Sequence, residues 1–251
     1  MKKAEETIAV WFSCGAASAV AAKLTLDMYG GGSQVRVLNN PVAEEDADNL
    51  RFRADVESWL GVPVETVSSS RYLTNSAVDV WEKRKFMSGP KGAPCTIELK
   101  KMARQEWEKN NRADWHVLGF TADEKTRHDR FVLTERSNVL PVLIDAGITK
   151  AECYRILLAA GLKLPRVYDM GYPNANCIGC VKATSPTYWN HVRKMHPDVF
   201  AARAEQSRRI GARLVRVNNQ RLFLDELDPE AIGRPMAGMD VECGIFCEEK
   251  P

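Results

Sequence analysis

The residues of this chain with the clearest capacity for chemistry are its cysteines. The 251-residue sequence contains seven, many for a chain of this length. Cys177 and Cys180 form a Cys-Ile-Gly-Cys motif, whose spacing lets both thiolates reach one metal ion or cluster. Such a pair can equally be a redox dithiol or half of a zinc site. Cys95 stands far upstream, so only the fold can bring it to the pair.

A second candidate site is the turn within FSCGAASAVAAKL, residues 12–24. The small residues from Ser13 to Ser18 separate an apolar run from a helix-like segment. A ligand can approach a backbone with so little side chain, and the N-terminus of the next helix offers N–H groups and partial positive charge that suit a phosphate. A turn that only packs a helix on a sheet has the same appearance, so the residues alone leave both readings open.

The elements that must position these residues alternate along the chain. Short apolar segments rich in β-formers predict strands at 8–13, 35–40, 62–68 and 115–121. Between the first three lie predicted helices at 19–30 and 44–61. This alternation indicates an α/β fold with a doubly wound, mostly parallel sheet, in which ligands bind beyond the carboxyl ends of the strands. The turn at Ser13–Ser18 and the segment GFTADEKTR, 119–127, both fall there. From about Asn176 onward helical patterns dominate.

Composition excludes few function classes. The net charge is +2, with 45% hydrophobic and 27% charged residues, which is ordinary for a globular protein. No apolar run approaches the ~20 residues that span a bilayer, and the start MKKAEETIAVWF does not resemble a signal peptide. We therefore expect a cytoplasmic protein with no membrane partner. The basic residues from Arg193 to Arg221 are either a contact surface for RNA or a sulfated nucleotide, or a solvated helix face.

Four stretches in the right order resemble the phosphoadenosine phosphosulfate (PAPS) reductase family. That family belongs to the wider PP-loop, or adenine nucleotide alpha hydrolase-like, group, and the chain is most similar in character to its compact phage-type members. The four stretches are SCGAAS at the phosphate loop, PCTIELKK, GFTADEKTR, and VYDMGYPNANCIGC. The resemblance implies a PP-loop nucleotide-binding domain at 1–175. A helical C-terminal region at 176–251 would complete one integrated unit.

The resemblance also implies an adenine-nucleotide site. Its expected residues are Ser13, Cys14, Gly15, Ala16, Ala17, Ser18, Gly119, Asp123, Glu124 and Arg127. Three positions depart from the family pattern: Ala17 replaces an Asp, Cys14 replaces a Gly, and Thr121 replaces an Arg. The loss of a carboxylate and a cation weighs against ATP turnover, whereas backbone N–H groups and serine hydroxyls can still hold phosphate.

Adenylyl-sulfate (APS) reductases of the family bind a [4Fe-4S] cluster through a cysteine pair and a later Cys-x-x-Cys. By this resemblance the metal ligands are Cys95, Cys177 and Cys180; Pro94 stands where the family has the neighbour of Cys95. Cys247 is assigned as a fourth ligand. An open iron that binds a sulfur species, as in cluster-dependent tRNA thiolases, is the alternative. Zinc is the main rival metal.

The C-terminal segment DVECGIFCEEKP resembles the end of sulfonucleotide reductases. Residues Glu242 to Ile245 match its Glu-Cys-Gly-Ile, and Phe246 replaces a His. The resemblance makes Cys243 the catalytic nucleophile toward sulfur. Cys247, four residues on, leaves open that both cysteines form a ligand arm or a dithiol.

The leading functional hypothesis is therefore a sulfonucleotide-reductase-like oxidoreductase of PAPS or APS, carrying an iron–sulfur cluster and supplied with electrons by a thioredoxin-like reductant. The first alternative is a PP-loop ATP pyrophosphatase that adenylates and thiolates an acceptor such as a nucleic-acid base. The second alternative is a non-catalytic nucleotide-binding module, which the replacement at Ala17 favours.

Overall fold

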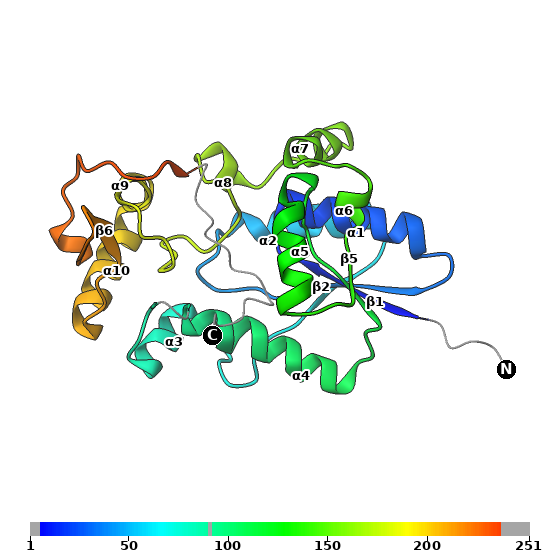
Figure 1. The fold of residues 1–251 in the computed structure, drawn as a ribbon, viewed down its shortest axis with the longest axis horizontal. Coiled ribbons are helices and arrows are strands. Elements are labelled where there is room, and N and C mark those ends of the chain that lie inside the picture. Colours follow the sequence, from blue (N-terminus) through cyan, green and yellow to red (C-terminus); the bar gives the residue numbers. More distant parts are fainter. Residues whose placement is uncertain (1–5, 90–91, 237–251) are drawn as a thin grey trace. The chain divides into compact units, whose positions relative to one another are not determined.

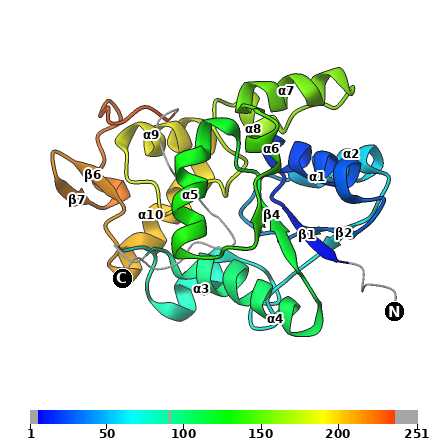
Figure 2. The ribbon, with the colours of Figure 1, turned by 45° about the vertical axis from the view of Figure 1, so that its right-hand side comes forward.

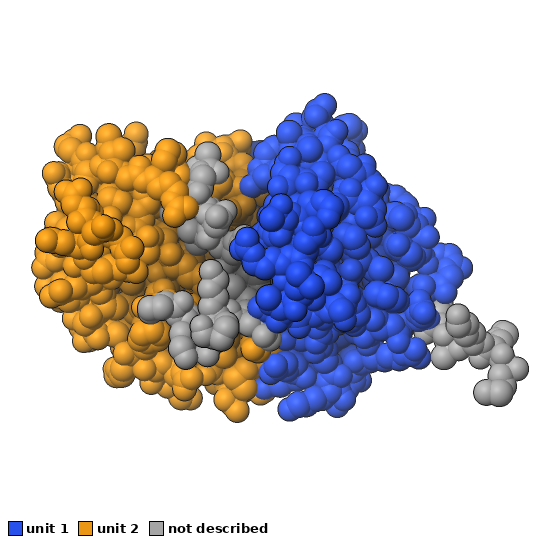
Figure 3. All heavy atoms as spheres, viewed as in Figure 1, with its two compact units in different colours: residues 1–41, 47–67, 104–166 blue, residues 42–46, 68–103, 167–251 orange. Residues whose placement is uncertain are grey.

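The computed structural model describes residues 6–89 and 92–236, which divide into two compact units (Figure 3). Unit 1 comprises residues 1–41, 47–67 and 104–166, and unit 2 comprises residues 42–46, 68–103 and 167–251. This division differs from the sequence-based boundary at 175. The stretch 68–103 packs with the C-terminal region because it supplies side chains such as Trp81 and Leu99 to the same core.

Unit 1 is built on alternating strands and helices (Figure 1). In chain order they are β1 (Thr7–Phe12), α1 (Ala16–Tyr29), β2 (Gln34–Asn39), α2 (Asp48–Leu60), β3 (Val64–Thr66), α4 (Met102–Asn110), β4 (Trp115–Val117), η2 (Ala122–Glu124), α5 (Lys125–Thr134), β5 (Val139–Leu140), α6 (Val142–Asp145) and α7 (Lys150–Ala159). The four sequence-predicted strands all form, and β5, which is only two residues long, was missed.

The strands form one parallel sheet in the order β3-β2-β1-β4-β5. This confirms the predicted α/β, doubly wound class. Every residue of β1 is buried, as expected for a central strand covered on both faces. The strand order reverses between β1 and β4, and open α/β sheets bind ligands at this kind of switch point.

Helices cover both faces of the sheet. On one face Phe12 of β1 contacts Phe52 of α2, with ring centroids 6.1 Å apart, and α1 packs against α2, α6 and α7. On the other face Trp11 meets Trp107 of α4 edge-on at 5.7 Å. Figure 2 shows α1 and α2 on one side of the strands and α4 on the other. The neighbouring residues Trp11 and Phe12 therefore anchor opposite layers, as the two-residue period of a strand requires.

Unit 2 is mainly helical and has its own core. Its elements are α3 (Ala77–Arg84), the π-helix η1 (Thr96–Lys101), α8 (Arg166–Asp169), α9 (Pro186–Met195), α10 (Pro197–Ile210), β6 (Val215–Val217), β7 (Gln220–Leu222) and η3 (Leu224–Glu226). The largest buried side chains of its core are Trp81 and Trp189. A short antiparallel hairpin, β6–β7, interrupts the helices of the predicted helical C-terminal region. Among the described residues no helix has the length and apolar content needed to cross a bilayer.

A buried polar group, His116, lies in the centre of unit 1. The side chain is fully buried in β4, and its Nδ1 accepts a hydrogen bond of 3.1 Å from Nε1 of Trp11. Its Nε2 lies 3.4 Å from Oε1 of Glu108 and beside Arg136. Burial lowers the pKa of His116 to about 4, the charges of Arg136 and Arg104 act in the same direction, and Glu108 opposes them. The imidazole is therefore neutral in the folded protein at pH 7.

His116 makes stability depend on pH in a predictable window. Because its folded pKa of about 4 lies below the ordinary value of 6.5, the unfolded chain binds the proton more readily. This contribution is fully present above pH 6.5 and is lost as the pH falls towards 4. We expect wild-type protein to lose about 2 kcal/mol more of its free energy of unfolding between pH 7 and pH 4.5 than His116→Gln does, measured by urea unfolding. Equal losses in both proteins would contradict the assignment.

Candidate nucleotide and metal sites

The turn between β1 and α1 has an unusual backbone. Cys14 has a φ of 56°, in the left-handed region that residues other than glycine rarely adopt. Its side chain is buried, and its Sγ accepts a hydrogen bond of 3.5 Å from Nδ2 of Asn39. Such a conformation costs on the order of 1 kcal/mol or more and persists only where its surroundings enforce it. The buried side chain of Cys14 therefore holds the turn against Asn39, while its neighbours Ser13 and Gly15 remain accessible to solvent.

Hydrogen bonds within the turn hold its shape. Oγ of Ser18 accepts from the backbone N–H of Ser13 at 3.1 Å and donates to the carbonyl oxygen of Gly15 at 2.9 Å. The Ser13 hydroxyl lies 3.2 Å from the same oxygen of Ser18. The buried Ser18 thus stabilises the turn by hydrogen bonds to its backbone, and the exposed hydroxyl of Ser13 can reach a ligand.

The N-terminus of α1 is open to an anion. Gly15 occupies the N-cap position and supplies no side-chain cap, and the first turn carries no acidic residue. The helix runs for 14 residues, so its dipole and terminal N–H groups favour negative charge here. Ala17, where the resembled family has an acid, keeps this end free of a competing carboxylate. The geometry accordingly suits phosphate more than it suits a metal ion.

Gly119, just after β4, borders this cradle. A Cβ at this position would lie 2.8 Å from the backbone nitrogen of Ser18 and 3.1 Å from the carbonyl carbon of Ala17. Contacts this short to backbone atoms force the loop or the strand end to move. Gly119 is therefore required for the close approach of β4 to the turn. The two segments meet at the switch point of the sheet, between β1 and β4.

The other expected nucleotide residues stabilise local structure. Oδ2 of Asp123 accepts from the backbone N–H of Lys150, at the start of α7. Oε2 of Glu124 closes a capping box by accepting from the backbone N–H and the hydroxyl of Thr121, at 3.1 and 3.2 Å. Arg127 pairs with Glu124 and lies over the ring of Phe120. Thr121, which stands at the family's Arg position, is thus part of this cap.

Sequence reasoning missed a supporting residue, Asn39. It ends β2 and is buried, and its Nδ2 donates both to the carbonyl oxygen of Phe12, at 2.9 Å, and to Sγ of Cys14. The amide side chain thus hydrogen-bonds the last carbonyl of β1, at the point where the chain enters the turn. A polar residue at the carboxyl end of the strand next to β1 was the available signal.

Three expected metal ligands belong to the core of unit 2. Cys180 is one of its buried members, and Cys95 and Cys177 pack against it, half-buried. Cys95 forms the N-cap of η1, a π-helix, and irregular turns of this kind are frequent at functional sites. The fold therefore places Cys95 and the distant pair in or against the same hydrophobic core, and their role as metal ligands stays a prediction.

The Cys-Ile-Gly-Cys turn is anchored at both ends. The backbone N–H of Ile178 donates to the carbonyl oxygen of Glu44 at 2.9 Å. The backbone N–H of Cys180 donates to Oη of Tyr188, which is fully buried, at 2.8 Å. Gly179 has a φ of 69°, and a Cβ there would lie 3.1 Å from Val199 of α10. Only glycine meets both demands without strain, which explains its place between the two cysteines.

The donor chemistry of this region fits an iron–sulfur cluster or zinc, since thiolates are the preferred ligands of both. Arg203 of α10 is buried beside this turn: its Nε lies 3.7 Å from the position of a Cβ on Gly179 and has no hydrogen-bond partner among the described residues. In the described part of the chain, no three His, Cys, Asp or Glu side chains are arranged to hold a metal ion. Cys243 and Cys247, the expected nucleophile and fourth ligand, lie outside the described residues.

Cys153 has a different character. It lies in α7, after the capping box of Thr149 and Glu152 that the sequence predicted, and its side chain is fully buried. Burial raises the pKa of its thiol to about 12, and the nearby charge of Glu152 adds to the shift. The thiol is therefore protonated at neutral pH and acts as a small apolar residue, as expected.

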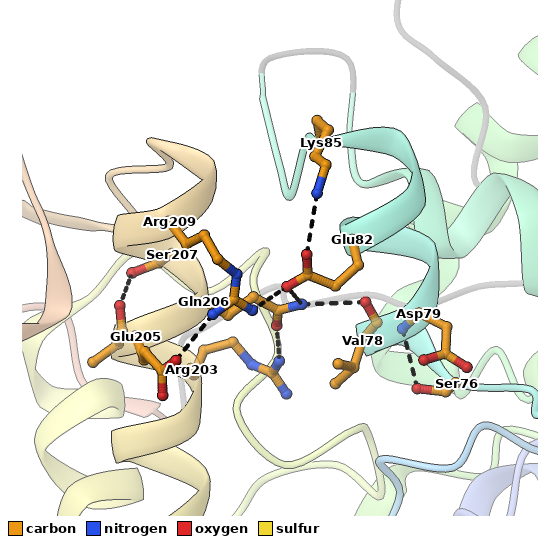
Figure 4. A network of polar contacts seen from close by, with 11 residues as sticks. Ser76, Val78, Asp79, Glu82, Lys85, Arg203, Glu205, Gln206, Ser207 and Arg209 are labelled. Carbon is orange, nitrogen blue, oxygen red and sulfur yellow. Dashed lines mark hydrogen bonds and ion pairs between the residues drawn. The ribbon is translucent and has the colours of Figure 1, made fainter.

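Most basic residues between Arg193 and Arg221 have internal partners. Arg208 pairs with Asp225 and Glu226, at 2.6 and 3.1 Å. Arg209 pairs with Glu82 of α3 and with Glu205 (Figure 4). Among the described residues, carboxylates therefore neutralise Arg208 and Arg209, two of the eight basic residues in this stretch, and of these carboxylates only Glu82 comes from a distant part of the sequence.

Unit 1 is a doubly wound α/β sheet, and the candidate phosphate site lies at the switch point of this sheet. The solved structure of the U34-tRNA thiolase NcsA from Methanococcus maripaludis with its [4Fe-4S] cluster is similar, with a TM-score of 0.50. The two sequences are 13% identical, and the match covers 97% of this chain and 84% of that chain. No protein-family model and no curated protein matches the sequence. The likeness supports the predicted PP-loop fold, and membership of the PAPS reductase family stays a prediction.

Proposed function

We propose that this protein is a PP-loop ATP pyrophosphatase that thiolates an acceptor and carries a [4Fe-4S] cluster. One observation carries the proposal: a single chain joins a small-residue turn before the N-terminus of α1, in unit 1, to a cysteine-bearing core in unit 2. The similarity to NcsA extends over 97% of the chain, and therefore over both parts. NcsA is a tRNA thiolase with a [4Fe-4S] cluster, so the proposed acceptor is a base in a nucleic acid.

The proposed reaction begins with ATP at the cradle. The terminal N–H groups of α1 and the Ser13 hydroxyl hold the phosphates that leave as pyrophosphate. A carbonyl oxygen of the acceptor attacks the α-phosphorus, the bond to pyrophosphate breaks, and an adenylated acceptor forms. A hydrosulfide then attacks the activated carbon and AMP leaves with the former carbonyl oxygen. The helix N-terminus stabilises the charge that develops on the leaving pyrophosphate.

The proposed ligands of the cluster are Cys95, Cys177 and Cys180. A cluster held by three thiolates leaves one iron able to bind a sulfur species. Two hydrogen bonds position the Cys-Ile-Gly-Cys turn: Oη of Tyr188 accepts from the backbone N–H of Cys180, and the carbonyl oxygen of Glu44 accepts from that of Ile178. Cys247 is the proposed fourth ligand if the cluster is closed, which would exclude this sulfur-binding role.

Sulfonucleotide reduction is the second candidate, because Glu242 to Ile245 match the tail of PAPS and APS reductases. In that reaction Cys243 attacks the sulfur of the nucleotide, the adenine nucleotide leaves, and a thioredoxin-like dithiol reduces the enzyme-bound thiosulfonate. The likeness to a thiolase favours the first candidate. A nucleotide-binding module without turnover is the third reading, and it is expected to bind ATP with neither product.

Product analysis distinguishes the candidates. We expect anaerobic protein given ATP, sulfide and RNA to release pyrophosphate and AMP in step with sulfur incorporation into the RNA. Given PAPS or APS with reduced thioredoxin, it should release no sulfite. The variant Cys243→Ser tests the same point, because a serine hydroxyl has far too high a pKa to attack sulfur at neutral pH. Sulfite release that disappears in Cys243→Ser, with no pyrophosphate from ATP, would contradict the thiolase proposal and establish the reductase.

A further inference from the structure

Four exposed basic side chains of unit 2 lie at the C-terminal end of α3 and on the segment that precedes this helix. They are Arg71, Lys83, Arg84 and Lys85. The next residue along the chain, Phe86, has a large aromatic side chain that is 48% exposed. We call these five residues the basic surface. The contacts that hold it together decide whether it is a chance accumulation of charge.

One buried carboxylate brings the two arginines of the basic surface together. The side chain of Glu98, in η1, is only 5% exposed, and it lies 3.4 Å from Nη2 of Arg84 and 4.0 Å from Nη1 of Arg71. At these distances the carboxylate attracts both guanidinium groups. Among the described residues, only Sδ of Met102 accepts a hydrogen bond from either guanidinium, from Nη1 of Arg71. Most of their N–H donors are therefore left for a ligand.

The ring of Tyr72 joins Lys83 to the two arginines. Nζ of Lys83 lies over this ring, 5.1 Å from its centroid, and has no carboxylate at ion-pair distance among the described residues. Tyr72 is buried. Burial raises the pKa of its hydroxyl, and the nearby charge of Glu98 adds to the shift, whereas the two arginines oppose it. Lys83 and the arginines thus share one surface.

The carboxylates of this region neutralise the basic surface only in part. Nζ of Lys85 lies 3.4 Å from Oε2 of Glu82, which also pairs with Arg209 of α10 (Figure 4). The four cations thus have two carboxylate partners in the described part of the chain, and one of these is shared with a cation outside the surface. The surplus of positive charge attracts anions.

The dipole of α3 explains this charge only in part. Basic residues in the last turn of a helix offset the negative end of its dipole, which accounts for Lys83 and Arg84. It does not account for Arg71, which comes from a different segment and meets Arg84 at Glu98. The convergence of the two segments therefore points to an anionic partner.

We propose that the basic surface binds the phosphate backbone of the RNA acceptor, and that Phe86 stacks on an unpaired base. The inference rests on the proposed function, because it takes the acceptor to be RNA. Guanidinium groups match phosphate oxygens in shape and charge, and exposed aromatic rings beside cations are typical of sites for single-stranded nucleic acid. An acidic protein segment offers carboxylates for the cations but no base to stack on the ring, which favours RNA as the partner.

The test measures the affinity for a fluorescently labelled single-stranded RNA by anisotropy, over a range of salt concentrations. Arg71→Gln/Arg84→Gln removes two proposed phosphate contacts, and Lys83→Gln removes one. Each contact to a single strand contributes about 0.7 to the slope of log affinity against log salt concentration, so we expect the slope to fall by about 1.4 and about 0.7. Affinity at low salt should fall at least about tenfold in the double variant.

Lys194→Gln is the matched control. Lys194 is an exposed lysine of α9 in the same unit, and its loss changes the net charge as much as Lys83→Gln does. It also belongs to the basic stretch from Arg193 to Arg221, the other candidate for RNA contact in the sequence. We expect Lys194→Gln to keep the wild-type affinity and slope.

Two substitutions of Phe86 separate stacking from packing. Phe86→Leu keeps an apolar side chain but removes the ring, so we expect about tenfold weaker RNA binding at an unchanged salt slope. Phe86→Tyr keeps the ring and should bind like wild type. These variants and Lys83→Gln leave the cations of the buried Glu98 in place. They therefore keep the proposal testable if the double arginine variant fails to fold by circular dichroism.

Three results overturn this inference. The first is wild-type affinity and slope in a folded Lys83→Gln or Arg71→Gln/Arg84→Gln protein. The second is an equal loss in Lys194→Gln, which marks a general effect of net charge. The third is displacement of the RNA by polyglutamate as readily as by unlabelled RNA, which marks a surface for acidic proteins. Wild-type protein that binds no RNA contradicts the nucleic-acid acceptor as well, so failure of this inference and failure of the proposed function are distinguishable.

Discussion

Gly119→Val is expected to abolish ATP binding to the folded protein. The Cβ alone would lie 2.8 Å from the backbone nitrogen of Ser18, and the two methyl groups of valine extend further into the cradle. The backbone of Ser18 cannot rotate out of the way as a flexible side chain can, so the whole turn must shift. The N–H groups at the start of α1 then no longer point together towards the proposed phosphate position. We expect a loss of more than a hundredfold in affinity, about 2.7 kcal/mol, in equilibrium dialysis or calorimetry.

The matched control is Gly32→Val, in the turn after α1, where an added Cβ meets nothing within 4 Å. It should leave ATP affinity unchanged. Gly119→Ala provides a milder substitution if the valine variant fails to fold, and circular dichroism checks the fold of each. Wild-type affinity in a folded Gly119→Ala protein would show that the turn between β1 and α1 is a packing turn and not a phosphate cradle.

Cys180→Ala is expected to remove the cluster and its colour. Cys180 lies in the core of unit 2, and its loss takes away one of the proposed thiolates at the better-buried end of the Cys-Ile-Gly-Cys turn. Fewer thiolates hold a cluster less firmly, so we expect anaerobic Cys180→Ala protein to lack the broad visible absorption near ~400 nm that is typical of thiolate-bound iron–sulfur clusters.

Cys153→Ala is the control for this substitution. Its thiol is also buried but lies in α7 of unit 1, so the variant should keep its iron while losing some stability. The side-chain change is the same in both variants, which separates ligation from packing. Iron retained in full by Cys180→Ala would remove Cys180 from the ligand set.

Local sequence was sufficient to predict the strand, turn and helix that carry the proposed phosphate site. The apolar run at β1, the small residues and the following helix all lie within residues 7–29, and each has a strong local signature. The burial of Cys153 and its preceding capping box were predictable for the same reason. β5 was missed because its two residues are too few to show a two-residue period.

Long-range packing explains what the sequence could not show. Arg203 appeared as one of many basic residues, and only the fold places it over Trp81, beside Gly179. Glu82, which neutralises Arg209, comes from a distant segment. The residues 68–103 likewise join the C-terminal core through contacts that no local pattern reveals. Gly119 was expected to serve the nucleotide, whereas its visible contact is with the turn itself.

The iron, acid-labile sulfide and zinc content of anaerobically purified protein tests the central claim most directly. An enzyme with a [4Fe-4S] cluster should contain about four iron atoms and about four sulfides per chain, and no zinc. Partial loss of iron during purification should be reversed by reconstitution with iron and sulfide. One zinc ion per chain and no iron, in protein that reconstitution leaves colourless, would contradict the account.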